Sequence, residues 1–233
     1  MHTNSKLAGS QDLKKSDRTR KHLLEISLEA FEKGGYDNCT MRDLAKKAGV
    51  TAPAFYYYFR SKEEIVAAFY TESLQRHLSD GVAGIVDGAP LVENLKTVTL
   101  QRLTEFSGSR ETLSVLKRFA LDRRNVLSPF HDDHRSIRAD SVGLFVQMID
   151  RTRLNPPVKI KRELAQLFWL FHLLILFYWI GDESSGSKKT KELLERSLAH
   201  ISAALLILRV PGAYRTLATI LETLKRAGLL EDL

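Results

Sequence analysis

The chain of 233 residues contains little cysteine, few prolines and almost no strand pattern. Its single cysteine, Cys39, excludes an internal disulfide bond. The six prolines avoid the long periodic segments, and polar and apolar residues rarely alternate, so the sequence predicts an all-α protein. The N-terminus is polar where a signal peptide requires a continuous apolar stretch, and we therefore expect a cytoplasmic protein.

The sequence also lacks the short motifs of common catalytic sites. It has no phosphate-binding glycine loop, no nucleophile elbow and no His-Glu-x-x-His pattern, so we expect neither an enzyme nor a cofactor. The segment His131-Asp132-Asp133-His134 leaves a metal site open, because histidines three residues apart on a helix share a face. Alternatively, Pro129 precedes a helix start whose acidic side chains complement the helix dipole. No other cluster completes a closed site, and we expect no bound metal.

Positive charge is concentrated near the N-terminus. The whole chain has 35 Lys or Arg and 28 Asp or Glu, a net charge of +7. Residues 1–62 hold 12 of the basic and 7 of the acidic residues, a balance of +5, and the remaining 171 residues carry only +2. A local cationic surface is what a polyanion partner requires, although basic tails also serve as solubilising segments.

Capping and breaking residues delimit four helices near the start of the chain. We expect residues 1–16 to form a disordered basic tail, and a first helix to run from Ser16 or Asp17 to Gly34-Gly35. Thr40 and Asp43 form a capping-box pattern before a second helix. The remaining signals are Gly49 as a helix stop, Thr51 as a cap, Pro53 in the first turn of a third helix over about 52–59, and Ser61 with Glu64 opening a fourth helix toward Ser79.

Residues 40–59 have the pattern of two short helices joined by a turn at Gly49. The small side chains of Ala45 and Ala48 allow the helices to approach closely. Helix-turn-helix units use this arrangement to insert the second helix into the major groove of DNA. The expected inward set is Leu44, Ala45, Ala48, Val50, Phe55 and Phe59, and the expected outward set is Thr51, Ala52, Ala54, Tyr57 and Tyr58.

The stretch from Thr19 to about Phe69 resembles the DNA-binding domain of the TetR family of transcriptional regulators. The resemblance implies a double-stranded DNA operator as partner, and an N-terminal three-helix domain followed by a larger helical bundle. The rest of the chain resembles the family in length and helical architecture. The elements that coincide are Thr19-Arg20, Phe31, Gly34-Gly35-Tyr36, Thr40 to Ala45, Ala48-Gly49-Val50, Phe55-Tyr56, Tyr58-Phe59 and Ser61-Lys62-Glu63-Glu64-Ile65.

The resemblance also implies roles for individual residues. Thr40 and Arg42 would contact DNA phosphates, reinforced by helix amides, and Tyr56 and Lys62 would also hold the DNA backbone. The segment Ala52-Pro53-Ala54 has no side-chain hydrogen-bond donor, so base reading would depend on thymine methyl groups and DNA shape. The residues that would read bases are Thr51, Ala52, Pro53, Ala54 and Tyr57.

Two features near this motif can be interpreted as structural rather than functional. Three consecutive tyrosines, Tyr56, Tyr57 and Tyr58, suggest a packing stripe, but one short helix cannot turn all three toward the core. We therefore expect at least one of them to be exposed. Cys39 fits a small, semi-buried residue before the helix cap, and a redox sensor is the alternative.

A looser junction precedes a series of longer helices. Gly81, Gly84, Gly88 and Pro90 mark this junction. We assign residues 17–77 to DNA binding, with the helix-turn-helix at 40–59, and residues 78–233 to effector binding and dimerisation. The expected helices of the second part are 91–107, 110–126, 133–153, 158–181, 188–209 and 212–228.

The segment Leu164 to Ile180 is nearly all apolar, with Gln166 and His172 as its interruptions. A membrane span needs about 20 apolar residues. This run is shorter and follows several charged residues, so we expect a buried helix and no membrane partner. Its two stripes, which need two apolar neighbours, are Leu167, Phe171, Leu174 and Tyr178 on one side and Phe168, His172, Ile175 and Trp179 on the other.

The resemblance further implies a homodimer, because TetR-family chains pair through their last long core helices, here 158–181 and 188–209. A two-fold dimer would place two recognition helices about 34–36 Å apart, in successive major grooves. The candidate interface residues are Leu167, Phe171, Leu174, Tyr178, Leu194, Leu198, Ile201 and Leu205.

An effector cavity is expected beside the apolar helix, because helical bundles bind flat or long apolar molecules between their helices. The candidate lining residues are Phe119, Phe145, Met148, Trp169 and His172, each of which also fits plain core. Which stripe faces the pocket and which the dimer partner is left open. We expect a homodimeric repressor that a small, largely apolar effector releases from a palindromic operator. One alternative is the same DNA-binding protein responding to a metal or redox signal. The other is a helical ligand carrier or scaffold without operator function.

Overall fold

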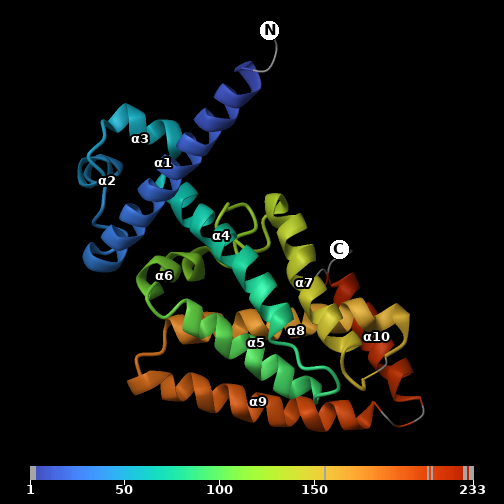
Figure 1. Cartoon of the computed structure of the whole chain (residues 1–233). Coiled ribbons are helices and arrows are strands. Elements are labelled where there is room, and N and C mark those ends of the chain that lie inside the picture. The colour runs from blue at the N-terminus through green and yellow to red at the C-terminus, as the bar shows by residue number, and fades with distance from the viewer. Residues whose placement is uncertain (1–3, 155, 209, 211, 228–229, 231–233) are drawn as a thin grey trace. The chain divides into compact units, whose positions relative to one another are not determined.

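A computed structural model describes the backbone of residues 4–154, 156–208, 210, 212–227 and 230, and the side chains of these residues except 4–14 and 159. This part of the chain is helical and contains no strand, as the sequence predicts (Figure 1). The α-helices are α1 (Asn4–Gly34), α2 (Met41–Lys47), α3 (Ala52–Tyr58), α4 (Lys62–Ala83), α5 (Leu91–Glu105), α6 (Arg110–Phe119), α7 (Arg135–Asp150), α8 (Val158–Ile180), α9 (Lys188–Ile207) and α10 (Ala213–Arg226).

The helices group into two compact units. The first unit contains the residues up to Glu72 together with Gly108–Ser128, and the second contains Ser73–Ser107 together with the residues from Pro129 onward. By sequence, α4 therefore begins in the first unit and ends in the second. Segment 108–128, which we assigned to the second part by sequence, lies in the first compact unit, where α6 packs against α1. The functional division of the chain stays a prediction.

Polar contacts between residues far apart in the sequence fasten α6 to α1. The Glu32 carboxylate accepts hydrogen bonds from the backbone N–H of Thr112 at 2.8 Å and from its hydroxyl at 2.7 Å. It thereby caps the first turn of α6, whose amides have no partner within the helix. The Arg118 guanidinium donates to both carboxylate oxygens of Asp37, at 3.0 and 2.7 Å.

Two helix boundaries differ from the sequence expectation. Helix α1 begins at Asn4, so residues 4–16 continue the helix where we predicted a disordered tail; residues 1–3 lie outside the described residues. No proline interrupts this stretch, and helix propagates from an existing turn at low cost. Helix α6 ends at Phe119 rather than at 126. Beyond it, the Asp122 carboxylate accepts the Arg124 N–H at 3.1 Å, a local bond that competes with the helical pattern.

Helix α4 continues to Ala83 and passes through Gly81, where we expected a junction. A Cβ atom at Gly81 would lie 3.0 Å from Cδ2 of Leu144 in α7. The glycine therefore serves the close packing of the second unit, in which its own lack of a side chain admits Leu144.

Helix α8 is the central helix of the second unit and packs against α5, α7, α9 and α10 (Figure 1). Its stripe of Phe168, His172, Ile175 and Trp179 is buried within the chain. On the opposite stripe Leu174 is 61% exposed and Tyr178 is 43% exposed. The first stripe therefore faces the core of this unit, and the second faces outward.

Residues Ile160–Ile180 of α8 have the length and composition of a membrane-spanning helix, and they are the one such segment among the described residues. Within its most apolar 18 residues, 56% are buried inside the protein. The burial agrees with the sequence prediction of a core helix.

Helix α10 covers the N-terminal part of α8. The centre of this contact is a buried cluster of Ile160, Leu221 and Leu230. The partly buried residues that pack around the cluster are Tyr214, Leu217, Leu224, Leu167 and Leu170.

Candidate nucleic-acid interface

Local hydrogen bonds define the start and end of α2. The Thr40 hydroxyl accepts the N–H of Asp43 at 3.2 Å, and the Asp43 carboxylate accepts the N–H of Thr40 at 3.1 Å, which completes the predicted capping box. After α2, Gly49 has φ +68°, a conformation that glycine adopts without strain. The N–H of Val50 then donates to the carbonyl of Ala45 at 3.0 Å and closes the turn.

Most of the expected inward set is buried, while Ala48 and Val50 are half-buried. Leu44, Phe55 and Phe59 are all 0% exposed, and the rings of Phe55 and Phe59 lie 6.1 Å apart. The Arg20 guanidinium of α1 stacks over the Phe59 ring at 4.8 Å, a cation–π contact. Because apolar and aromatic packing fixes one side of α3, the opposite side is held in a defined orientation toward solvent.

The outer side of α3 presents the residues expected to read bases. Thr51 accepts the N–H of Ala54 at 3.4 Å and caps the helix, while Thr51, Pro53 and Ala54 are exposed and Ala52 is half-buried. Tyr57 is 80% exposed, and its ring meets that of Tyr58 edge to face at 5.1 Å. The expectation that at least one of the tyrosines is exposed is therefore confirmed.

The residues expected to hold DNA phosphates differ in their exposure and in the contacts that they already make within the chain. Arg42 is exposed and makes no ion pair with any described residue, and Tyr56 is 45% exposed. The Thr40 hydroxyl donates its proton to Asp43 at 2.6 Å, and these hydrogen bonds hold the pKa of Asp43 below its usual value. Thr40 therefore keeps no free proton for a phosphate in this arrangement.

Lys62, at the first position of α4, is also engaged within the chain. Its ammonium donates to the carbonyl oxygen of Tyr36 at 2.7 Å and lies 4.2 Å above the Tyr36 ring. The Tyr36 hydroxyl donates to Glu63 at 2.9 Å, and burial together with this bond raises the pKa of Tyr36. An ammonium has three protons, so Lys62 retains donors for a phosphate while it holds α4 against the end of α1.

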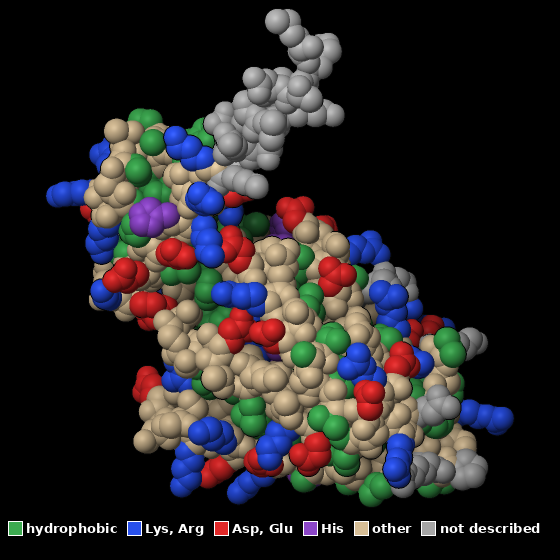
Figure 2. Space-filling view, viewed as in Figure 1, with side chains coloured by type: hydrophobic (Ala, Val, Ile, Leu, Met, Phe, Trp, Pro, Cys, Tyr) green, Lys and Arg blue, Asp and Glu red, His purple; other side chains and the backbone are tan. Residues whose placement is uncertain are grey.

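Lys and Arg side chains are scattered over the visible surface of α1 and α2, with Asp and Glu side chains between them (Figure 2). On the described residues next to the motif, Lys46 and Lys47 of α2 and Arg60 before α4 are exposed. The local excess of basic residues seen in the sequence thus lies in the unit that contains the helix-turn-helix.

The alternative sensor residues have local structural roles. Cys39 is buried, and its thiol donates to the Ala30 carbonyl at 3.5 Å. The Nδ1 atom of His131 accepts the N–H of Asp133 at 3.2 Å, at the start of the short 3₁₀ helix Asp132–His134. Among the described residues, no group of three or more His, Cys, Asp or Glu side chains is arranged to hold a metal ion.

Four of the five residues expected to line an effector cavity are buried. Phe145, Met148, Trp169 and His172 are buried in the second unit, and Phe119 is a half-buried residue of the first unit. His172 lies 3.2 Å from the Thr99 hydroxyl through Nδ1 and stacks on His77 at 5.2 Å between ring centres. These five residues do not line the pocket beside α5, α9 and α10 that is described below. Their role in an effector cavity stays a prediction.

The candidate dimer residues also separate into two groups. Leu167 and Phe171 are half-buried and Leu174 and Tyr178 are exposed, as an interface stripe requires. On α9, Leu194 is 1% and Leu198 is 5% exposed, because the inner face of α9 packs against α5 and α8. Their burial assigns these two leucines to the core of the single chain, and the dimer interface itself stays a prediction. Ile201 and Leu205 are half-buried.

The geometry defines a helix-turn-helix protein with a separate helical bundle, and comparison with known proteins specifies the family. Residues 23–69 match the model of bacterial regulatory proteins of the tetR family, and residues 95–212 match the model of the tetracyclin repressor-like C-terminal domain. The chain belongs to the TetR family. Members of this family are DNA-binding transcriptional regulators and not enzymes.

Individual relatives agree with this assignment. The uncharacterized HTH-type transcriptional regulator YdgC of Bacillus subtilis is 40% identical over 58 residues, which are 25% of this chain and 30% of YdgC. The chain matches only about a quarter to a third of the length of such curated relatives. 

Two crystal structures share the fold at low identity. A TetR transcriptional regulator from Nitrosomonas europaea has a TM-score of 0.52 and 20% identity, with 78% of this chain and 96% of that chain covered. The TetR-family repressor FadR of Thermus thermophilus, solved with lauroyl-CoA, has a TM-score of 0.57 and 17% identity, with 81% and 93% covered.

Proposed function

We propose that this protein is a homodimeric, ligand-responsive transcriptional repressor that a small, largely apolar effector releases from a palindromic DNA operator. The observation that carries the proposal is the division of α3 into two sides. Phe55 is fully buried while Tyr57 is 80% exposed, so the packing that fixes the helix also leaves its reading side free. A major groove admits a helix presented in this way.

In this proposal, different side chains recognise the DNA bases and bind the DNA phosphates. Thr51, Ala52, Pro53, Ala54 and Tyr57 face the bases, where methyl contacts and DNA shape supply specificity because only Thr51 and Tyr57 carry side-chain polar groups. Arg42, Tyr56 and Lys62 hold phosphates, and Thr40 acts through the helix start that it caps.

The outward stripe of α8 supports the dimer. Four apolar side chains, Leu167, Phe171, Leu174 and Tyr178, remain wholly or partly accessible in the single chain, and a second copy would bury them. Leu206 and Ile207 at the end of α9 are also exposed, at 56% and 63%.

Release follows from a population shift. An effector that binds the second unit more tightly in a DNA-incompetent arrangement of the dimer lowers operator affinity by its differential affinity for the two arrangements. By sequence, helix α4 continues from the unit that reads DNA into the unit that receives the effector, and in this proposal the shift acts through this continuous helix.

The test is fluorescence anisotropy of the protein on duplexes from its own upstream intergenic region. Arg42→Ala is expected to weaken binding to all sequences alike and to lower the slope of log affinity against log salt by about 1. Tyr57→Ala is expected to reduce the preference between related sequences and to leave the salt slope unchanged. Lys191→Ala, an exposed lysine of α9 in the other unit, is the matched control. A change of base preference in Arg42→Ala would contradict the phosphate role.

A further inference from the structure

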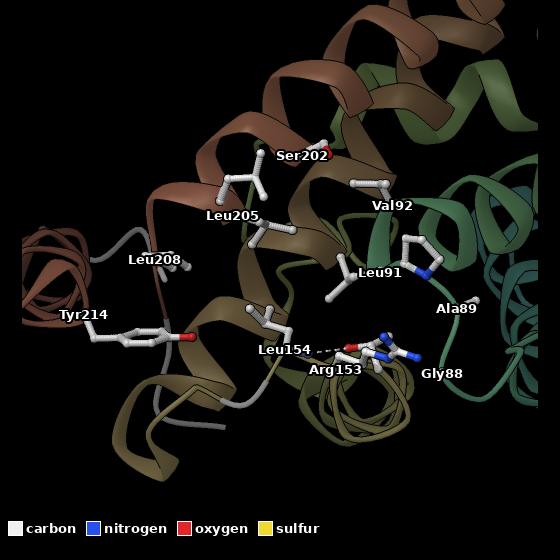
Figure 3. Close-up of a pocket in the computed structure, with 13 residues that line it drawn as sticks. Gly88, Ala89, Leu91, Val92, Arg153, Leu154, Ser202, Leu205, Leu208 and Tyr214 are labelled. Atoms are coloured by element: carbon white, nitrogen blue, oxygen red, sulfur yellow. Dashed lines mark hydrogen bonds between the residues drawn. The ribbon is translucent and has the colours of Figure 1, made fainter. Parts of the chain in front are cut away.

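The larger pocket described in the second unit lies away from the residues that the sequence suggested for an effector (Figure 3). Its volume is about 730 Å³, within the range of small-molecule sites. Four segments form it: the start of α5 with the loop before it, the first part of the loop after α7, the last turns of α9, and Tyr214 of α10.

The wall is apolar over much of its extent. Figure 3 shows Leu91, Leu154, Leu205 and Leu208 around the pocket, with the Tyr214 ring on the side of α10. Tyr214 is held in place because it packs against the Ile160, Leu221 and Leu230 cluster. An apolar ligand portion would therefore meet fixed aliphatic and aromatic surface.

Three polar side chains on the wall have no partner among the described residues. These are the Arg153 guanidinium, the Ser202 hydroxyl and the Tyr214 hydroxyl. Thr152, by contrast, is already used: its hydroxyl donates to the Ile149 carbonyl at 2.9 Å and accepts the Leu154 N–H at 3.4 Å. The pocket thus offers donors that the protein itself does not satisfy.

The charge of the wall has one sign. Of the 13 described lining residues, Arg153 is the one with a formal charge, and no carboxylate lines the pocket. Arg151, two residues earlier, lies outside the lining, where it donates to the Val82 carbonyl at 3.2 Å and pairs with Asp87 at 3.8 Å. Burial raises the pKa of Tyr214, which keeps the phenol protonated as a donor.

We propose that this pocket binds an amphiphilic organic anion, with its carboxylate or comparable acid group at Arg153 and its apolar portion along the leucines and Tyr214. Arginine binds a planar carboxylate through two parallel hydrogen bonds, and the unpartnered hydroxyls of Ser202 and Tyr214 are further donors. The assignment of this pocket as the effector site rests on the proposed function. The proposal that it binds a ligand depends only on the residues of its wall. Ser202, Leu205 and Leu206 belong to α9, so occupancy bears directly on a helix proposed for the dimer.

The test measures binding of decanoate and 1-decanol, which share a chain and differ in charge, by displacement of the fluorescent probe 8-anilinonaphthalene-1-sulfonate. Wild-type protein is expected to prefer decanoate by about tenfold or more. Arg153→Ala is expected to lose about tenfold in decanoate affinity with little change for decanol, and Arg153→Lys to recover part of the loss. Arg162→Ala, an exposed arginine of α8 outside the pocket, is the matched control.

A second variant tests the location independently. Leu205→Trp fills the pocket and is expected to remove binding of both ligands while circular dichroism reports an unchanged helix content. Equal decanoate affinity in wild type and Arg153→Ala, or unchanged binding in Leu205→Trp, would overturn the proposal. DNA binding is followed in the same samples: Arg153-dependent decanoate binding without any effect on DNA would retain the site and reject it as the effector site of the proposed repressor.

Discussion

The stacked histidines of the second unit predict a specific sensitivity to acid. His77 of α4 and His172 of α8 are 4% and 5% exposed, with their ring centres 5.2 Å apart. Burial, together with the positive charge of Arg102 and the neighbouring imidazole, lowers the pKa of His77 to about 2. Burial and Arg102 lower that of His172 to about 3. Both imidazoles are therefore neutral in the native protein throughout the range from pH 8 to 5.

The magnitude follows from the unfolded chain. An unfolded histidine titrates near pH 6.5, so it takes up a proton at pH 5 that the buried native imidazole does not. The depressed folded pKa values mean that stability is fully present above about pH 6.5 and is lost as the pH falls below it. At pH 5.0 the loss is about 2 kcal/mol for each histidine, or about 4 kcal/mol for the pair. The precise folded values do not alter this figure, because both lie below the range measured.

The assay is urea unfolding from pH 8.0 to 5.0 at fixed protein concentration. The double variant His77→Gln/His172→Gln is expected to be less stable at pH 8 but to lose about 4 kcal/mol less than wild type on acidification. His200→Gln, on the exposed side of α9, is the matched control. An equal loss of stability in wild type and double variant would refute the assignment of these histidines as buried and neutral.

The structure predicts the effect of three further substitutions. Arg102→Ala removes a buried guanidinium that donates to the Ser73 carbonyl at 2.8 Å and to Glu105 at 2.9 Å; we expect a loss of about 3–5 kcal/mol in urea unfolding, and less than 1 kcal/mol would contradict it. Thr40→Ala removes the α2 cap and is expected to cost about 1 kcal/mol in thermal unfolding, with no loss counting against the capping role. Leu174→Arg places a charge on the outward stripe of α8 and should yield monomers in sedimentation velocity; an unchanged dimer would exclude this face.

The helix-turn-helix was predictable because its signals are local. The Thr40 cap, the Gly49 turn and the Thr51 cap each act within a few residues, and the structure contains all three. The division of the tyrosines also follows from helix periodicity alone, since adjacent residues on one helix point in different directions.

The remaining features depend on contacts between distant residues. Glu32 meets Thr112 across 80 positions of sequence, and no local pattern reports that α6 belongs with α1. The same holds for Phe145 and His172: by sequence they fit both cavity wall and core, and their burial results from the packing of α5, α7 and α8. Leu194 likewise fits both faces of α9 until its neighbours are known.

Nuclease footprinting of the protein on its own upstream DNA tests the central claim most directly. The account predicts two symmetric protected half-sites whose centres lie about 10 base pairs, one helical turn, apart. It also predicts that Tyr57→Ala weakens this pattern selectively over non-specific DNA. A footprint with no repeated half-site, or the absence of protection on every genomic fragment, would contradict a dimeric operator-binding regulator.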